Sequence, residues 1–341
     1  MFAKKSVKHS LLLLLSLALL LTSLLNVACK KGRKNGQAID RVSLRLQWFH
    51  LAQFAGFYCA KDNGLYSARK IDLQINPGGP DFNAIPLVAN GSDTFGVWTA
   101  DQILIAQSRG VPITILAVIY REDPNVLMVM ENSGIRSPAD FRGKRITTVF
   151  GRATETVLRA LLLRSGLTEK DVVIEPFPFN VLSFLQGKVD VSAAYSFDHP
   201  FQVMKAGAKI IIIRPSDYGI KFYSDCIFAR SDLITNNPAL VQRFISASLA
   251  GWEYALQNKS KAVDSVLALN PQLDRESQEF MLDSAEPLIL AEDPQRLGLV
   301  SDSSINAMVK ILRDQGQVPK EFSSANVYNN KFVINYYSAK K

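Results

Sequence analysis

The sequence predicts an α/β protein with two lobes, mostly parallel sheets flanked by helices, and a helical C-terminal region. The first observation is that predicted strands, in which apolar and polar residues alternate, are followed by predicted helices from residue 41 to about residue 215. The second is that this pattern restarts near Asp123 and Pro124, which indicates two successive units of similar size. The third is that the apolar residues from about Asn237 onward recur with helical spacing.

The first unit is predicted to begin with a strand over residues 41–48, because apolar and polar residues alternate there. Phe54, Phe57 and Tyr58 then have the i, i+3, i+4 spacing of a helix, which ends near Asn63 and Gly64. Further strands are predicted at 71–75, 94–98 and 113–120, with helices after "NPGGPD" and after Thr99.

The second unit follows the same plan, and its predicted strands and helices alternate from residue 125. The predicted strands are 125–130, 144–150, 171–177, 191–195 and 209–215, and the predicted helices are 154–166, 181–187 and 199–207. The C-terminal helices are predicted at 237–258, 261–269, 274–290 and 304–316.

Composition excludes several classes of protein. The chain has 341 residues and is 48% hydrophobic, enough for two domains with a substantial core. Its net charge of +8 comes almost entirely from seven Lys and Arg residues within residues 1–36, which contain no acid. The rest of the chain is therefore close to neutral, and we expect no nucleic-acid partner.

The N-terminus is typical of a secretion signal over residues 1–28, with lysines before the apolar run Leu11–Leu21. That run is shorter than the roughly 20 residues a membrane-spanning helix needs. Cys29 follows Leu25 and Ala28 in a pattern that resembles the cleavage box of bacterial lipoproteins, although Asn26 stands where Leu is usual. We expect lipidation of Cys29, a tether over 29–40, and export to the extracytoplasmic face of a membrane. An ordinary cleaved signal and an uncleaved anchor are the alternatives.

Cysteine and histidine usage argues against metal and nucleophile chemistry. Cys59 and Cys226 both lie beside apolar residues, where a free buried cysteine is the more frequent outcome, although pairing stays open in an exported protein. There is no CxxC, HExxH, GxSxG, P-loop or GxGxxG pattern, and the chain has three histidines. We expect no metal, no cofactor and no catalytic residue.

The junctions between strands and helices are the candidate site, because ligands of open α/β sheets bind at the carboxyl ends of strands. Trp48 and Tyr58 are predicted to form a ring-stacking wall, since each has an apolar body and a polar group. Phe54 is a further candidate, with core packing as its alternative. Trp98 ends another predicted strand.

Polar recognition is expected from residues at the other junctions. Gly78 and Gly79 can expose backbone N–H groups, and Asp81 is either a hydrogen-bond acceptor for the ligand or a helix cap. In the second unit, Glu155 follows a glycine turn at a helix start. Tyr195 and Asp198 end a strand, and no nucleophile accompanies them.

These segments resemble the substrate-binding proteins of ABC importers in the NMT1/THI5-like family, over roughly Arg41 to Asn270. The resemblance rests on "LQWFHLAQFAGFYCAKDNGLY", "IDLQINPGGPD", "GSDTFGVWTAD", "GIRSPADFRGKRI", "KVDVSAAYSFDHP" and "GWEYALQNKSKAVDSVL". It implies the two-lobed periplasmic binding protein fold of the second type, with chain crossings near Asp123 and Tyr223. Lobe 1 would then comprise 41–124 and 224–341, and lobe 2 would comprise 125–223.

The resemblance also implies a monomeric binder that works with permease and ATPase subunits and takes a thiamine pyrimidine precursor or riboflavin. Related branches take sulfonates or nitrate, which is the alternative ligand class. The family includes a pyrimidine synthase with an active-site histidine and a cysteine cluster. That histidine position falls on Phe54 here, and no cysteine cluster exists, so the resemblance implies no enzyme. A sensor or adhesion lipoprotein without transport is a further alternative.

Overall fold

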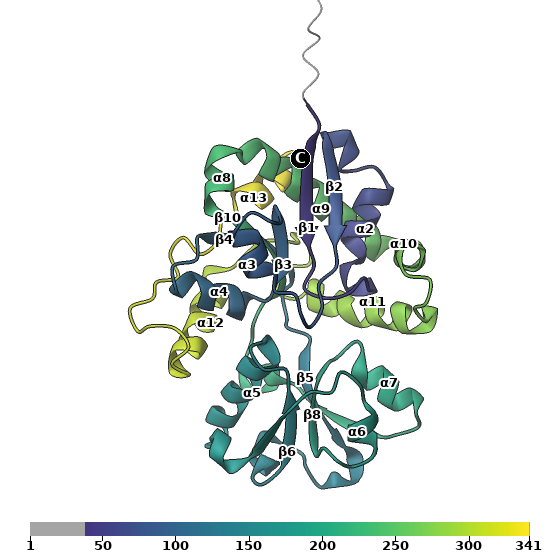
Figure 1. Cartoon of the computed structure of the whole chain (residues 1–341), viewed down its shortest axis with the longest axis vertical. Coiled ribbons are helices and arrows are strands. Elements are labelled where there is room, and N and C mark those ends of the chain that lie inside the picture. Colours follow the sequence, from purple (N-terminus) through teal and green to yellow (C-terminus); the bar gives the residue numbers. More distant parts are fainter. Residues whose placement is uncertain (1–37, 341) are drawn as a thin grey trace, which may run out of the picture. The chain divides into compact units, whose positions relative to one another are not determined.

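The computed structural model describes residues 38–340, and from Asp40 these residues belong to one compact unit. The predicted signal peptide, the lipidation site Cys29 and the tether residues 29–37 lie outside the described residues. The unit contains two lobes, each built on a five-stranded sheet, as Figure 1 shows. It therefore has the two-lobed α/β architecture that the sequence predicts.

The first lobe holds a sheet in the order β2-β1-β3-β10-β4. Its strands are β1 (Asp40–Arg45), β2 (Ile71–Asn76), β3 (Phe95–Trp98), β4 (Ile113–Tyr120) and β10 (Ser224–Arg230). Three helices lie between its strands in the chain: α2 (Ala55–Asp62), α3 (Ala84–Ala89) and α4 (Ala100–Ser108). Strand β1 ends three residues before the predicted end, so Trp48 lies in the loop that follows it.

The helical C-terminal region packs on the first lobe (Figure 1). It comprises α8 (Ser231–Asn236), α9 (Pro238–Gln257), α10 (Lys259–Leu269), α11 (Arg275–Ile289), α12 (Asp302–Asp314) and α13 (Lys331–Ser338). Helix α11 reaches the side of the first lobe that faces the second lobe.

The second lobe holds a sheet in the order β7-β6-β8-β5-β9. Its strands are β5 (Asn125–Met130), β6 (Arg145–Thr148), β7 (Val173–Pro176), β8 (Val191–Tyr195) and β9 (Ile210–Ile213). Its helices are α5 (Ala153–Arg164), α6 (Leu182–Leu185) and α7 (His199–Lys205). The chain passes from one sheet to the other twice, between β4 and β5 and again between β9 and β10.

Each sheet contains more antiparallel pairing than the sequence suggests. In the first sheet β1 pairs parallel with β2 and β3, whereas β10 pairs antiparallel with β3 and β4. In the second, β6 pairs parallel with β7 and β8, whereas β5 pairs antiparallel with β8 and β9. The reason is that β5 and β10 each enter a sheet directly from the other lobe, without a crossover helix on the new sheet.

Two glycines let α2 and α9 pack closely in the core of the first lobe. A Cβ on Gly56 would lie 2.2 Å from the Trp252 ring, and one on Gly251 would lie 2.2 Å from the Gly56 carbonyl oxygen. Both contacts join one helix to the other, so the glycines set the distance between α2 and α9. No helix within residues 38–340 is long and apolar enough to cross a membrane.

Candidate functional site

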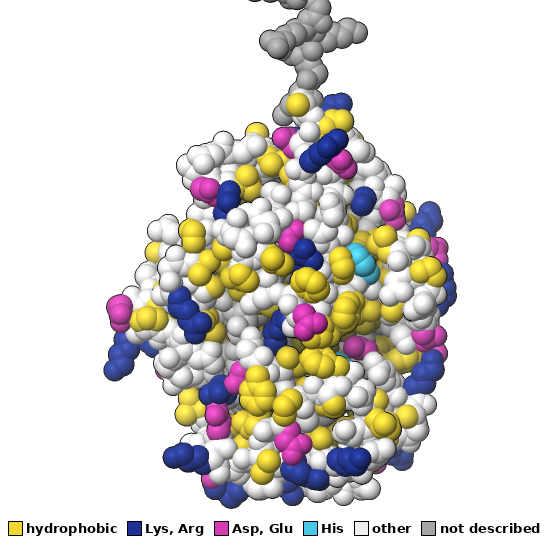
Figure 2. Space-filling view, in the orientation of Figure 1, with side chains coloured by type: hydrophobic (Ala, Val, Ile, Leu, Met, Phe, Trp, Pro, Cys, Tyr) yellow, Lys and Arg dark blue, Asp and Glu magenta, His cyan; other side chains and the backbone are white. Residues whose placement is uncertain are grey.

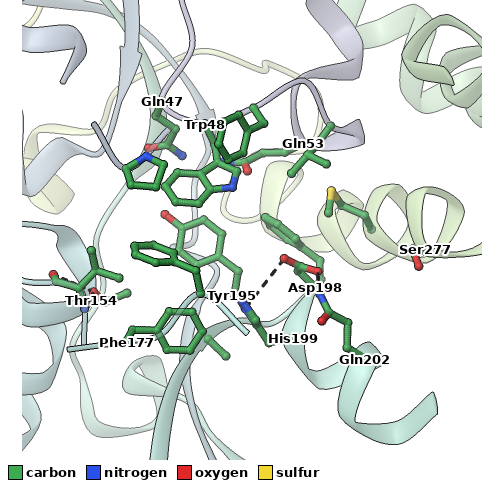
Figure 3. A pocket seen from close by; sticks show the side chains of 18 of the residues that line it. Gln47, Trp48, Gln53, Thr154, Phe177, Tyr195, Asp198, His199, Gln202 and Ser277 are labelled. Atoms are coloured by element: carbon green, nitrogen blue, oxygen red, sulfur yellow. Dashed lines mark hydrogen bonds and ion pairs between the residues drawn. The ribbon is translucent and has the colours of Figure 1, made fainter. Parts of the chain in front are cut away.

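A cavity of about 590 Å³ lies between the two lobes (Figure 3), within the volume range of small-molecule sites. It is bounded by the loop after β1, the carboxyl ends of β3 and β8, the loop after β7, and the starts of α5, α7 and α11. Both Cys59 and Cys226 are free and buried outside this lining. The cavity therefore occupies the strand-to-helix junctions that the sequence singles out.

Aromatic rings from both lobes form most of the wall. Trp48 of lobe 1 stacks on Phe179 of lobe 2, with ring centroids 5.7 Å apart and an angle of 27° between the planes. Phe177 contacts Phe179 edge-to-face at 5.6 Å and His199 at 5.0 Å. Such rings offer flat faces to a planar ligand.

The mouth of the cavity is also apolar. Phe49 and Phe179 belong to the cavity lining, and each is about half exposed. Figure 2 shows hydrophobic side chains gathered across the middle of this face, where the lobes meet. An exposed cluster of this kind is typical of a site that meets a ligand or partner.

Arg152, at the start of α5, joins lobe 2 to lobe 1. Its Nη2 donates to the carbonyl oxygens of Gly79, Pro80 and Phe82 at 3.0–3.1 Å. Its guanidinium also lies 4.5 Å from the centroid of the Trp98 ring. Burial lowers the pKa of Arg152. This cation is committed to backbone oxygens and a ring across the cleft, rather than to an anion at the helix start.

A second group of contacts joins the lobes on the side of α7 and α11. Lys205 of α7 pairs with Asp274 at 3.2 Å and with Glu276 at 2.7 Å. Phe201 stacks on Phe280 with centroids 4.6 Å apart. The two lobes therefore touch on two sides of the cavity, and these contacts bound the space between the lobes.

Polar groups complete the lining at several points. Asp198 accepts from Gln202 at 2.7 Å and lies 3.9 Å from Nδ1 of His199 (Figure 3). Burial lowers the pKa of His199, so this imidazole is neutral near pH 7. Its Nδ1 has no hydrogen-bond partner within residues 38–340. Tyr195 keeps its hydroxyl proton, because burial and nearby carboxyls raise its pKa.

Three buried carboxyls lie behind the cavity, at the two chain crossings and at the start of α4. Burial raises the pKa of Asp225 to about 8 and that of Asp123 to about 7. Asp101 is fully buried, and its proximity further raises the pKa of Asp123. One oxygen each of Asp101 and Asp123 has no hydrogen-bond partner within residues 38–340.

These carboxyls predict that stability falls as the pH rises from 6.5 to 8. In this window the folded protein keeps protons on Asp225 and Asp123 that the unfolded chain, with ordinary carboxyl pKa values near 4, has already lost. For each extra proton that the folded state holds, the free energy of unfolding falls by up to about 1.4 kcal/mol for every unit by which the pH rises. The lowered pKa values of His50 and His199 oppose this slope near pH 6.5, because the unfolded chain still protonates part of both imidazoles there, and the opposition fades as the pH approaches 8.

Urea unfolding at pH 6.5, 7.25 and 8 measures this slope. Asp225→Asn is the matched variant, because asparagine tolerates the left-handed backbone at this position, where φ is +46°. The slope should be smaller in Asp225→Asn than in the wild type. Equal slopes in the two proteins would show that Asp225 does not hold a proton in this range.

Four of the predicted site residues line the cavity: Trp48, Trp98, Tyr195 and Asp198. Phe54 and Tyr58 do not, because both side chains point into the core of lobe 1 and are at most 1% exposed. The Tyr58 hydroxyl bonds to His50 at 3.0 Å, beneath the wall rather than on it. The helical spacing of these rings marks the buried face of α2.

The remaining predicted residues shape the site from outside the lining. The Gly78 N–H donates to the Trp48 carbonyl at 2.8 Å, and a Cβ on Gly78 would lie 2.3 Å from the Leu46 carbonyl oxygen. Gly79 offers its carbonyl oxygen to Arg152. These glycines hold the loop against the end of β1, and neither places its N–H in the cavity lining.

Asp81 and Glu155 are also absent from the lining. Asp81 is exposed, and α3 is capped by Asn83, whose side chain accepts from the Ile85 N–H at 2.9 Å. Glu155 accepts from the Gly151 N–H at 2.7 Å and from Arg159 at 2.8 Å. Asp81 therefore faces solvent, and Glu155 contacts residues of its own lobe.

Several lining residues were missed by the sequence analysis. Phe177 and Phe179 follow the carboxyl end of β7, so the rule that identified the other junctions could have found them. Gln53 lies between the predicted first strand and Phe54, in a segment rich in aromatic residues. Gln278 and Met281 come from the middle of α11, and no local pattern distinguishes them from ordinary helical residues.

The sequence profile of the NMT1/THI5-like family matches residues 51–262. The chain belongs to the NMT1/THI5-like family. The riboflavin-binding protein RibY of Chloroflexus aurantiacus is 25% identical over 310 residues, covering 86% of each chain. The formylaminopyrimidine-binding protein of Halalkalibacterium halodurans is 23% identical, over 79% of this chain and 86% of its own.

Enzymes and other binding proteins also resemble the chain. A 4-amino-5-hydroxymethyl-2-methylpyrimidine phosphate synthase of Legionella pneumophila is 22% identical, over 69% of this chain and 75% of its own. Among solved structures, the aliphatic sulphonate binding protein SsuA of Escherichia coli superposes with a TM-score of 0.65 at 18% identity, over 83% of this chain and 89% of that one. This structural likeness establishes the periplasmic binding protein fold, and the binding-protein relatives support a solute-binding role.

Proposed function

We propose that the protein is the substrate-binding lipoprotein of an ABC importer and captures a flat heteroaromatic solute between its lobes. The solute class is that of a thiamine pyrimidine precursor or riboflavin. The observation that carries this proposal is the cavity of about 590 Å³ whose walls are aromatic rings from both lobes. The names of the relatives from Chloroflexus and Halalkalibacterium agree with this class.

The charges around the cavity argue against the alternative of a sulfonate or nitrate. Within residues 38–340, Arg152 is the only Lys or Arg in the lining, and its Nη2 is shared among three carbonyl oxygens. Asp198 adds negative charge to the wall, whereas Asp274 is paired with Lys205. A bound anion would face the Asp198 carboxylate while Arg152 is already engaged with lobe 1, which is unfavourable in a partly desolvated site.

The proposed role in transport rests on the two chain crossings between the lobes. Closure about them would enclose the solute, and the closed form would then dock on the permease and ATPase subunits. In this proposal the protein acts as a monomer, held by a lipid on Cys29 at the extracytoplasmic face of the membrane. A gene neighbourhood without permease and ATPase genes would favour a sensing or adhesion role instead.

A synthase role has less support in the described residues. Residues 38–340 contain no group of three or more His, Cys, Asp or Glu positioned to hold a metal ion. Phe54, which aligns with the synthase histidine, is fully buried in the core of lobe 1. We therefore propose binding without turnover. Product formation from the protein's own side chains, detected by intact-mass analysis, would overturn this part of the proposal.

Trp48→Ala is expected to weaken binding of a heteroaromatic solute by about tenfold or more, because stacking on an aromatic side chain contributes about 1–3 kcal/mol. Trp48 is only partly buried, so the melting temperature of the ligand-free variant should change little. Trp98 is 2% exposed and packed in a core, so replacing it would perturb folding together with the site. Calorimetric titration with riboflavin and with 4-amino-5-hydroxymethyl-2-methylpyrimidine measures the loss.

Tyr254→Ala is the matched control for Trp48→Ala, because it removes a partly buried aromatic ring that packs on the lobe 1 core away from the cavity. Its affinity for the same solute should equal that of the wild type. If Trp48→Ala and Tyr254→Ala bind alike, Trp48 has no place in the binding wall.

A further inference from the structure

Asp225 is a buried carboxyl placed directly behind the cavity, at the start of β10. Its side chain has no exposed surface, and its backbone has the left-handed φ of +46°. Gln47 and Gln53 both donate to it through Nε2, Gln53 at 3.0 Å to Oδ1 and 3.2 Å to Oδ2. Both glutamines also line the cavity. One hidden carboxyl thus holds two side chains of the site.

This arrangement determines which end of each amide faces Asp225. An amide turned around would bring its carbonyl oxygen against a carboxyl oxygen, and two acceptors repel each other. Oδ1 accepts from both glutamines, and it remains an acceptor even when a proton is bound to Oδ2.

The carbonyl oxygens of Gln47 and Gln53 are left for the cavity. Neither Oε1 has a hydrogen-bond partner within the described part of the chain. Neither Oε1 is fully buried in protein, so each can still be reached by a bound molecule. Gln278, also in the lining, has the opposite orientation: its Oε1 accepts from the Ala52 N–H at 2.8 Å, which leaves its N–H₂ group for the cavity. The wall near Trp48 thus offers two fixed acceptors and one donor.

We propose that Asp225 is a positioning residue that fixes Gln47 and Gln53 as hydrogen-bond acceptors, so that the site selects a heteroaromatic solute with N–H donors on its edge. This inference rests on the proposed function, because it concerns the solute bound in the same cavity. A solute that cannot donate there leaves two buried carbonyl oxygens without partners. Each carbonyl oxygen left without a hydrogen-bond donor lowers the affinity for that solute by about tenfold or more.

The first test needs no ligand and examines the positioning alone. In protein labelled with ¹⁵N at glutamine side chains, Gln47→Met and Gln53→Met assign the two NH₂ signals. In the wild type both signals should exchange with water at least about tenfold more slowly than those of exposed glutamines, because both N–H₂ groups are buried against Asp225. Asp225→Gly, which suits the left-handed backbone, should abolish this protection. Rapid exchange of both signals in the wild type would overturn the positioning role.

The second test compares 4-amino-5-hydroxymethyl-2-methylpyrimidine with its analogue in which a methyl group replaces the amino group, and riboflavin with 3-methylriboflavin. The first pair is nearly isosteric, so a difference reports the lost N–H donors. The wild type should bind the N–H member of the pair it accepts at least about tenfold more tightly. Gln47→Met and Gln53→Met should reduce this ratio, and Asp225→Gly should bring it close to one. Asp225→Asn, which keeps one acceptor oxygen, should restore part of it.

Gln278→Met is the matched control, because it removes a donor from the same wall. Its overall affinity should fall while the ratio between the two members of a pair stays at the wild-type value. Equal binding of both members by the wild type, or a ratio unchanged in Asp225→Gly, would overturn the selection. Binding of neither pair by the wild type would overturn the proposed function instead, and the exchange measurement would still decide the positioning of the two amides.

Discussion

Replacing Arg152 with methionine is expected to weaken solute binding by about 10- to 100-fold. The change removes three hydrogen bonds from a cation to lobe 1 carbonyls and a cation–π contact with Trp98, all of which form between the lobes. Such contacts contribute about 1.5–3 kcal/mol for a charged hydrogen bond and about 0.5–2 kcal/mol for the ring. Their loss lowers the closed population, and apparent affinity falls with that population.

Arg159→Met is the matched control, because Arg159 lies on the same helix and pairs with Glu155 of its own lobe. Calorimetric titration gives the affinities of both variants, and small-angle X-ray scattering reports the degree of closure. Arg152→Met should bind more weakly and be more open with and without solute, whereas Arg159→Met should match the wild type. An Arg152→Met protein with wild-type affinity and closure would show that this contact does not hold the lobes.

Gly251→Val is expected to destabilise the protein by about 3 kcal/mol or more. A Cβ at this position would lie 2.2 Å from the Gly56 carbonyl oxygen and 2.4 Å from the Ala60 Cβ, and neither atom belongs to a flexible side chain. Helices α2 and α9 would have to separate, which opens the core of lobe 1 around Trp252. Urea unfolding followed by circular dichroism measures the change.

Ala239→Val on the same helix is the control for Gly251→Val, since Ala239 is exposed near the start of α9. It adds a β-branched side chain without a steric conflict and should change stability by less than about 0.5 kcal/mol. Similar stabilities of Gly251→Val and Ala239→Val would mean that the helices do not depend on the glycine contact.

The order of strands and helices could be predicted from periodicity, because alternation and helical spacing report which face of each element is buried. The same signal could not place Phe54 and Tyr58. The spacing of these rings shows that one face of α2 is apolar, but a core and a ligand cleft are equally apolar partners for it. The structure turns this face toward α9 and the lobe 1 core.

The candidate site could be predicted only where it lies at the ends of strands. Trp48, Trp98, Tyr195 and Asp198 follow that rule and line the cavity. The contribution of α11 arises from tertiary packing of a distant helix, and nothing local in residues 275–289 signals it. The role inferred for Asp225 depends on hydrogen bonds to residues more than 170 positions away in the chain, which no local pattern reveals.

The most direct measurement for the central claim is the melting temperature of the purified protein in the presence of single candidate solutes. The panel comprises riboflavin, 4-amino-5-hydroxymethyl-2-methylpyrimidine, thiamine, taurine and nitrate. A solute at roughly 100 times its dissociation constant stabilises the folded state by about 2.7 kcal/mol, which raises the melting temperature clearly. The account predicts such a rise with a heteroaromatic solute and none with taurine or nitrate. A rise with taurine or nitrate alone would contradict the account and assign the cavity to a small anion.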